Sequence, residues 1–101
     1  MNAIYKESNA QWVITIDMDM DLYTVPRLRE LMLDCIAKRQ AGIELDCAGM
    51  GYIDSTGLGV LVSTLNKVRA YDGTITITGL KPHIRKIFKI TGLEGIFSLK
   101  E

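Results

Sequence analysis

The chain has few of the residues that build metal sites and catalytic centres. Its 101 residues include one histidine and two cysteines with no CxxC spacing, so a Cys/His zinc site cannot be assembled. We expect Cys35 and Cys47 to be small buried hydrophobes in a reducing compartment. A serine-hydrolase triad is not expected, because His83 is the one histidine and no nucleophile-elbow motif surrounds Ser55 or Ser63.

Motifs that bind phosphate or calcium are also lacking. No Gly-Lys-Ser or Gly-Lys-Thr triplet occurs, and Asp54 stands where Gly49-Met50-Gly51 would need a third glycine to form a dinucleotide-binding loop. The run DMDMD at residues 17–21 is similar to the opening of an EF-hand, but leucine occupies its sixth and twelfth positions. We interpret this run as a continuing strand with carboxylates on one face and methionines on the other. The sequence predicts no metal, no cofactor and no enzymatic activity.

Net charge and long apolar runs are absent as well. Twelve basic and twelve acidic side chains cancel, so binding to nucleic acid or to an anionic membrane has no electrostatic basis. We interpret one local basic segment as a solvated helix face; its members are Lys81, His83, Arg85, Lys86 and Lys89. No apolar segment approaches the roughly 20 residues that span a bilayer, and residues 1–8 lack a signal-peptide pattern. We expect a cytoplasmic protein.

The hydrophobic residues, 48% of the chain, follow alternating strand and helix periods within one domain over residues 1–101. We predict strands over residues 3–7, 12–16, 43–47, 74–78 and 96–99, and helices that begin near residues 25, 55 and 82. Thr24 is the predicted N-cap of the first helix and Gly42 its predicted stop. Gly92 or Gly95 is expected to end the third helix.

This order predicts an α/β fold with a mixed, mainly parallel sheet of four to five strands and helices packed against it. In such sheets, ligands and partners bind at the loops beyond the carboxyl ends of the strands. These loops are residues 17–23, 48–56 and 79–81, and parallel strands bring all three to one edge. Within the second loop we expect residues 48–51 to be flexible.

The start of the second helix is the most informative segment. Asp54, Ser55 or Thr56 can serve as its N-cap. Gly57 and Gly59 are unusual in the first turns, since each costs about 1 kcal/mol relative to alanine, and we expect them to leave the helix end open to a docking partner. Helical spacing predicts one core-facing stripe, made of Leu58, Leu61, Val62, Leu65 and Val68.

A phosphoryl group on Ser55 would place nearly two negative charges at the positive end of this helix. The fold should tolerate that charge, whereas a partner that docks there through an apolar or acidic patch would not. Phosphorylation could therefore end binding with little refolding.

The segment YIDSTGLG at residues 52–59 resembles the signature of STAS domains, named for sulphate transporters and anti-sigma factor antagonists. The segments at residues 21–29 and 90–93 are similar to the family's stretches that lead into the first helix and close the third. The resemblance covers nearly the whole chain. Met18 is a departure, since family members usually carry glycine there; it could rigidify a bulge or add an apolar contact that changes the choice of partner.

The resemblance implies an anti-sigma factor antagonist that regulates transcription, for example in stress response or sporulation. Unphosphorylated, it binds an anti-sigma factor that is also a serine kinase and so releases a sigma factor. The kinase phosphorylates Ser55, with Thr56 as second choice, and a PP2C-type phosphatase restores the active form. By the same match Asp21 lies beside the phosphorylated loop. The predicted partner-binding residues are Asp21, Tyr23, Asp54, Ser55, Thr56, Gly57 and Leu58, although helical spacing favours Leu58 and Val62 as core.

Two alternatives stay open. The chain could be a scaffold STAS protein of a stress-signalling complex, phosphorylated by a different kinase. It could also be a module that binds a small ligand, a lipid or a nucleotide, at the same edge. A monomer or a weak dimer fits the neutral charge.

Overall fold

In the computed structural model, which describes residues 1–101, five strands form one sheet in the order β1-β2-β3-β4-β5. The strands are β1 Asn2–Lys6, β2 Gln11–Thr15, β3 Gly42–Asp46, β4 Ile75–Thr78 and β5 Ser98–Lys100. The helices are α1 Val25–Lys38, α2 Ser55–Arg69 and α3 Pro82–Ile90, and a short 3-10 turn covers Leu93–Gly95. Only β1 runs antiparallel to its neighbour. The predicted order and mixed sheet are confirmed, with strand boundaries shifted by one or two residues.

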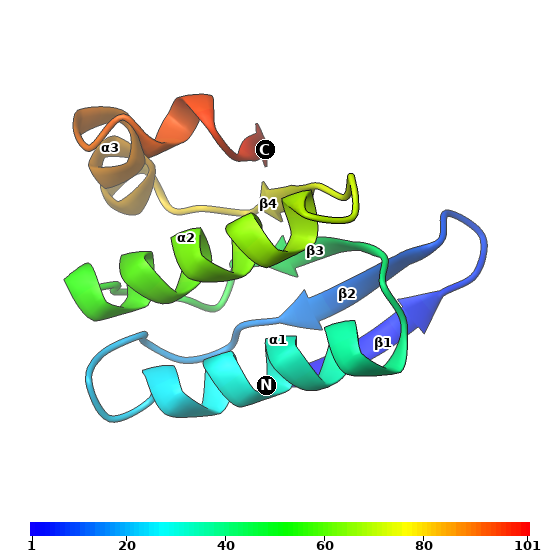
Figure 1. Cartoon of the computed structure of the whole chain (residues 1–101). Helices are drawn as coiled ribbons and strands as arrows, with labels where there is room; N and C mark the ends of the chain where they lie inside the picture. Colours follow the sequence, from blue (N-terminus) through cyan, green and yellow to red (C-terminus); the bar gives the residue numbers. More distant parts are fainter.

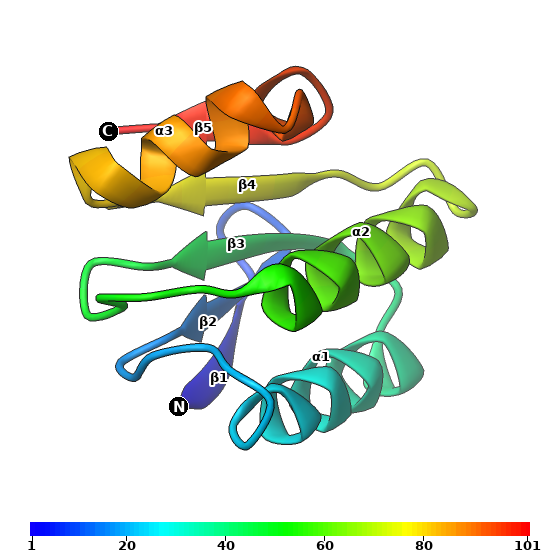
Figure 2. The same cartoon turned by 90° about the vertical axis from the view of Figure 1, so that its left-hand side faces the viewer.

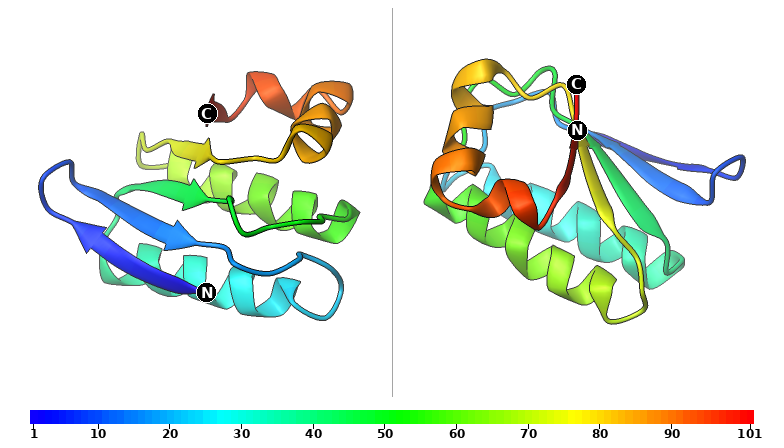
Figure 3. Two further views of the ribbon diagram at one scale, coloured as in Figure 1. Left: turned by 180° about the vertical axis from the view of Figure 1, so that it is seen from behind. Right: turned by 90° about the horizontal axis from the view of Figure 1, so that it is seen from above.

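All three helices lie on one side of the sheet (Figure 1; Figure 3, right). Alternate strand residues point toward them: Ile14, Leu45 and Ile77 are neighbours in register and fully buried. Glu44 and Thr78 point to the opposite face, which no helix covers, and are half-buried. Side chains therefore make one hydrophobic core between sheet and helices, as the strand period of two requires.

Helix α1 begins where it was predicted, but its first turn is held differently. Thr24 occupies the N-cap position without a capping side-chain bond. Its hydroxyl donates to the carbonyl of Asp19 at 2.7 Å, and the carboxylate of Asp21 accepts the N–H groups of Tyr23 and Thr24 at 2.9 and 3.1 Å. Asp21 thus organises the turn that leads into the helix.

Gly42 does not end α1, and that prediction is wrong. The helix ends at Lys38, and Gly42 is the first residue of β3. A Cβ at this position would lie 3.3 Å from the carbonyl oxygen of Thr74 and 3.3 Å from the Gln11 side chain. The glycine therefore allows close packing of neighbouring strands.

The buried stripe of α2 is rotated relative to the prediction. Leu58 and Val62 are half-buried and pack beside the core. The fully buried positions are Gly57, Val60, Leu61, Thr64, Leu65 and Val68. In α3, Ile84 and Phe88 are buried and Ile87 is half-buried. Gly92 follows the helix with φ of 77°. This left-handed conformation confirms Gly92 as the residue that ends the third helix.

The carboxyl ends of β2, β3 and β4 point to the same side of the molecule (Figure 2). The loops that follow them, residues 16–24, 47–54 and 79–81, therefore meet at one edge of the sheet, as predicted. No helix combines the length and the apolar character needed to cross a membrane.

Candidate functional site

The loops after β2 and β3 pair with each other beyond the sheet. The N–H of Met20 donates to the carbonyl of Tyr52 at 2.9 Å, and the N–H of Asp54 donates to the carbonyl of Met20 at 3.0 Å. Met20 and Ile53 form a single parallel bridge and are both buried. The start of α2 is thereby fixed against the segment that leads into α1.

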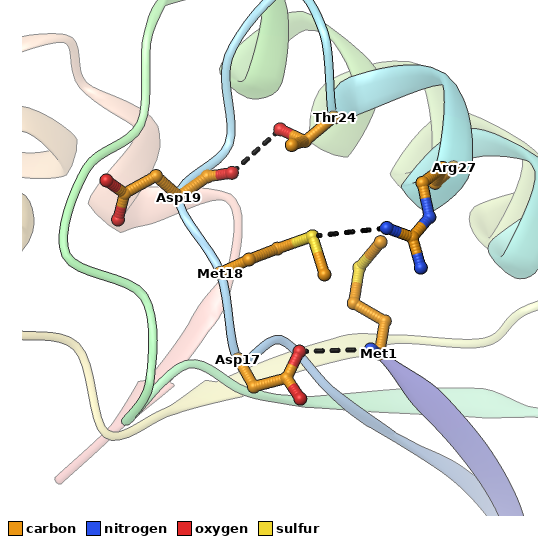
Figure 4. A network of polar contacts seen from close by, with 6 residues as sticks. All are labelled: Met1, Asp17, Met18, Asp19, Thr24 and Arg27. Carbon is orange, nitrogen blue, oxygen red and sulfur yellow. Dashed lines mark hydrogen bonds and ion pairs between the residues drawn. The ribbon is translucent and has the colours of Figure 1, made fainter.

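The three aspartates of residues 17–21 make separate contacts. Asp19 Oδ1 accepts the N–H of Gly51 at 3.0 Å, which joins the two loops again, while Asp21 contacts only its own turn. The carboxylate of Asp17 binds the amino group of Met1 at 3.0 Å (Figure 4). Strand β2 ends before this run, so the prediction of a continuing strand is wrong, but the carboxylates point outward and the methionines inward as expected.

Met18, at the position where the STAS resemblance expects glycine, lies beside α1. Arg27 Nη1 is 3.9 Å from its sulfur, and the side chain packs against the core (Figure 4). Its φ is not positive, so the backbone does not require glycine there. Met18 therefore adds an apolar contact within the chain, while its expected effect on the choice of partner stays a prediction. Nearby, the amino group of Met1 lowers the pKa of Asp17, mainly through the hydrogen bond.

Residues 48–51 are tightly held, in contrast to the expected flexible exit. Met50 is fully buried, and its N–H donates to the carbonyl of Cys47 at 3.0 Å. A Cβ on Gly49 would lie 2.9 Å from the Cα of Asp17, so no larger residue fits without movement. Local composition predicted freedom here, but the contacts with distant segments remove it.

The start of α3 contacts the same loop. The side chain of Lys81 donates to the carbonyl of Ala48, and His83 Nε2 lies 2.8 Å from the carbonyl oxygen of Gly51. Gly79 has φ of 73°, and a Cβ built on it would lie 3.0 Å from the backbone N atom of Ala48. The glycine therefore lets the chain pass close to Ala48. The basic segment is largely a solvated face, as interpreted, since His83, Lys86 and Lys89 are exposed; Lys81 and His83 in addition bind backbone carbonyl groups of residues 48–51.

Asp54 caps α2. Its Oδ1 accepts the N–H of Thr56 at 3.0 Å, the N–H of Gly57 at 3.1 Å and the hydroxyl of Thr56. The Thr56 hydroxyl and then the Gly57 N–H lower the pKa of Asp54, because both favour the charged carboxylate. Among the three predicted cap candidates, the structure selects Asp54.

Ser55 and Thr56 differ in how their hydroxyl groups are used. Both side chains are exposed. The Thr56 hydroxyl is bound to Asp54, whereas the Ser55 hydroxyl makes no hydrogen bond within the chain. Ser55 is therefore the hydroxyl that an incoming enzyme can reach without breaking an existing bond.

The two glycines after Ser55 have different environments. A Cβ on Gly57 would lie 2.7 Å from Ile53 Cγ1 and 3.3 Å from Met20 Cβ, so this glycine is needed for packing and does not open the helix end. A Cβ on Gly59 would meet no atom within 4 Å. Only Gly59 agrees with the expected open approach.

Exposed apolar side chains surround this edge. Tyr23 is 86% exposed, Leu22 66% and Tyr52 51%. Large exposed apolar groups gathered in one place are typical of protein-binding sites. Tyr23 was predicted as partner-binding, whereas Leu22 and Tyr52 were missed, although each lies on a strand-end loop. We call Leu22, Tyr23, Tyr52, Ser55 and Thr56 the strand-end surface.

The half-buried side chains of α2 extend outward from this surface. Leu58 and Val62 line a shallow groove on the outer side of the helix, together with Gly59, Ser63, Asn66, Lys67 and Ala70. Residues 55, 58 or 59, 62 and 66 recur on one side of a helix, so the groove begins about one turn beyond Ser55, at Leu58 and Gly59.

Comparisons with known proteins agree with this arrangement. The STAS domain family model matches residues 2–101. An anti-sigma-B factor antagonist from Staphylococcus epidermidis is 32% identical over 88 residues, which cover 87% of this chain and 82% of that protein. The chain belongs to the STAS domain family. Its relatives are named as antagonists of an anti-sigma factor, which confirms that the chain is not an enzyme.

Solved STAS structures share the fold. A protein from Thermotoga maritima superimposes with a TM-score of 0.90 at 16% identity, covering 99% of this chain and 85% of that one. The anti-sigma factor antagonist SpoIIAA, in its unphosphorylated form, gives a TM-score of 0.77 at 18% identity, covering 99% and 86%. The five-stranded sheet and three helices therefore form a STAS domain.

Proposed function

We propose that this STAS domain is an anti-sigma factor antagonist whose binding is switched by phosphorylation of Ser55. In the unphosphorylated form, the strand-end surface binds an anti-sigma factor that is also a serine kinase, so that a sigma factor is released. The kinase then phosphorylates Ser55 and the complex dissociates. A PP2C-type phosphatase removes the phosphoryl group and restores binding.

The observation that carries the proposal is the position of the Ser55 hydroxyl. It is exposed and makes no hydrogen bond within the chain, and it belongs to the same surface as the exposed Tyr23 and Tyr52. The neighbouring hydroxyl of Thr56 is bound to Asp54. Both the modification and the docking of a partner therefore fall on one surface, and Ser55 is favoured over Thr56 as acceptor.

The charges near Ser55 support a switch that acts on binding. The N–H groups of Thr56 and Gly57 at the start of α2 already donate hydrogen bonds to Asp54. The one ion pair of the chain joins Met1 to Asp17. A phosphoryl group adds about −1.5 to −2 charges at neutral pH. Because Ser55 is exposed, that charge lies on the surface that faces the partner, next to apolar side chains that binding would desolvate.

The test is intact-mass spectrometry with site mapping, after incubation with ATP and a candidate anti-sigma kinase from the same genome. We expect one added phosphoryl group on Ser55, lost in Ser55→Ala and retained in Thr56→Ala. Ser63→Ala is the matched control, since Ser63 lies on the same helix two turns further on. A subsequent incubation with a PP2C-type phosphatase should remove the added mass.

Other outcomes separate the alternatives. A stable complex with the kinase but no modification would contradict the switch and favour the scaffold role. Modification of Thr56 alone would show that the Asp54 hydrogen bond does not protect that hydroxyl. If no kinase binds or modifies the chain, the antagonist function is wrong.

A further inference from the structure

The loop that carries Ser55 is held from two sides. From the β2 side, Asp19 accepts the N–H of Gly51 at 3.0 Å. From the α3 side, His83 Nε2 lies 2.8 Å from the carbonyl oxygen of the same Gly51, and Lys81 binds the carbonyl of Ala48. Gly51 is thus bound through both its donor and its acceptor by segments that are each 32 residues away in sequence.

The chemistry of the His83 contact is fixed by its acceptor. A backbone carbonyl oxygen can only accept, so Nε2 must carry a hydrogen. A neutral ring is then the Nε2–H tautomer, and an imidazolium donates through the same atom. The contact therefore needs a donor at the end of the side chain and does not need a positive charge. Glutamine, with an amide N–H at similar reach, can supply such a donor.

We infer that His83 is a positioning residue, which holds Gly51 so that Ser55 is presented in one orientation. His83 is exposed, so it adds little to the core, while Gly51 stands only four residues before Ser55 and three before the cap Asp54. The expected effect of His83 on the rate of Ser55 phosphorylation rests on the proposed function. The restraint of Gly51 by His83 does not, and it can be measured without a partner.

The first test measures hydrogen exchange of the Gly51 amide by NMR in wild type, His83→Ala, His83→Gln and the control Lys86→Ala. Loss of one hydrogen bond should speed local exchange by about two- to tenfold in His83→Ala. Glutamine should restore most of the protection. Lys86 is exposed and makes no hydrogen bond, so Lys86→Ala should exchange as wild type does.

The second test measures phosphorylation kinetics with the anti-sigma kinase. We expect His83→Ala to raise KM for the chain several-fold with kcat and melting temperature unchanged, and His83→Gln to return KM toward wild type. A rise in KM that is equal in His83→Ala and His83→Gln would indicate lost packing rather than a lost hydrogen bond and overturn the inference.

A measurement on the wild-type chain tests the inference even if the His83 variants fail to fold. The ¹⁵N shifts of the His83 ring in the wild-type chain should identify a hydrogen on Nε2; the Nδ1–H tautomer as the main neutral form would overturn the inference. Equal Gly51 exchange in wild type and His83→Ala would do the same. If no kinase modifies the wild type, the proposed function fails, but the exchange and tautomer results still decide whether His83 restrains the loop.

Discussion

A Cβ built on Gly57 would lie 2.7 Å from Cγ1 of Ile53, whereas one built on Gly59 meets nothing within 4 Å. The two glycines therefore make a matched pair within one helix. Gly57→Ala should destabilise the fold by about 1–3 kcal/mol through overpacking. Gly59→Ala should stabilise it by up to about 1 kcal/mol, since alanine is the better helix former. Urea denaturation checks both, and equal stabilities would contradict the packing assigned to Gly57.

For these two glycines, the sequence predicted the helix but not the packing. Helix α2, its start and its cap were predictable because spacing and capping are local properties. Which glycine is packed could not be predicted, because Ile53 and Met20 approach only one of them in the fold. The rotation of the buried stripe toward Val60 likewise depends on the rest of the fold, including α1, which packs beside α2.

The site divides in the same way. The convergence of three loops at one edge follows from strand order, and the motif at residues 52–59 indicated Ser55. The contacts of Asp19 and His83 with Gly51 join residues 32 apart, and no local pattern encodes them. A clue was available only for Leu22 and Tyr52, since apolar residues on strand-end loops are candidates for exposure.

A negative charge at position 55 should weaken partner binding without unfolding the chain. Ser55→Ala is expected to melt as wild type does and to stay bound to the kinase in the presence of ATP, because it cannot be phosphorylated. Ser55→Asp should bind at least several-fold more weakly, since a carboxylate then faces the partner. Titration calorimetry measures both. Equal affinity of Ser55→Asp and wild type would refute the electrostatic switch.

Tyr23 should contribute to binding and not to folding. Its side chain is 86% exposed, so Tyr23→Ala removes almost no buried contact, while tyrosines in a protein interface often carry 1 kcal/mol or more, roughly a fivefold change in affinity. Ile90→Ala is the control: Ile90 is 73% exposed but ends α3, a helix that starts at the strand-end edge. A weaker complex for Ile90→Ala than for Tyr23→Ala would place the interface elsewhere.

The Asp54 cap should make stability depend on acid. The hydroxyl of Thr56 and the N–H of Gly57 hold the pKa of Asp54 below its usual 3.8, so the unfolded chain takes up the proton first as pH falls. The cap therefore stabilises the fold fully at neutral pH and down to about pH 3.8, the pKa in the unfolded chain. The stabilisation disappears as pH falls through the lower pKa that Asp54 has in the folded chain. Asp54→Ala should melt earlier than wild type at neutral pH, and the difference should shrink in acid. A difference independent of pH would mean that the charge of the cap is unimportant.

Cys47 should respond in the opposite direction, at alkaline pH. Burial raises the pKa of its thiol from 9.0 to about 12, so above 9.0 the unfolded chain loses a proton that the folded chain keeps. Stability from this group is complete below pH 9.0 and falls as pH rises toward 12. The free energy of unfolding of wild type minus that of Cys47→Ala should decrease over this range in urea titrations, because alanine has no proton to lose. The same burial should keep iodoacetamide from alkylating native Cys47 until urea unfolds the chain; rapid labelling of the folded protein would show that the end of β3 opens to solvent.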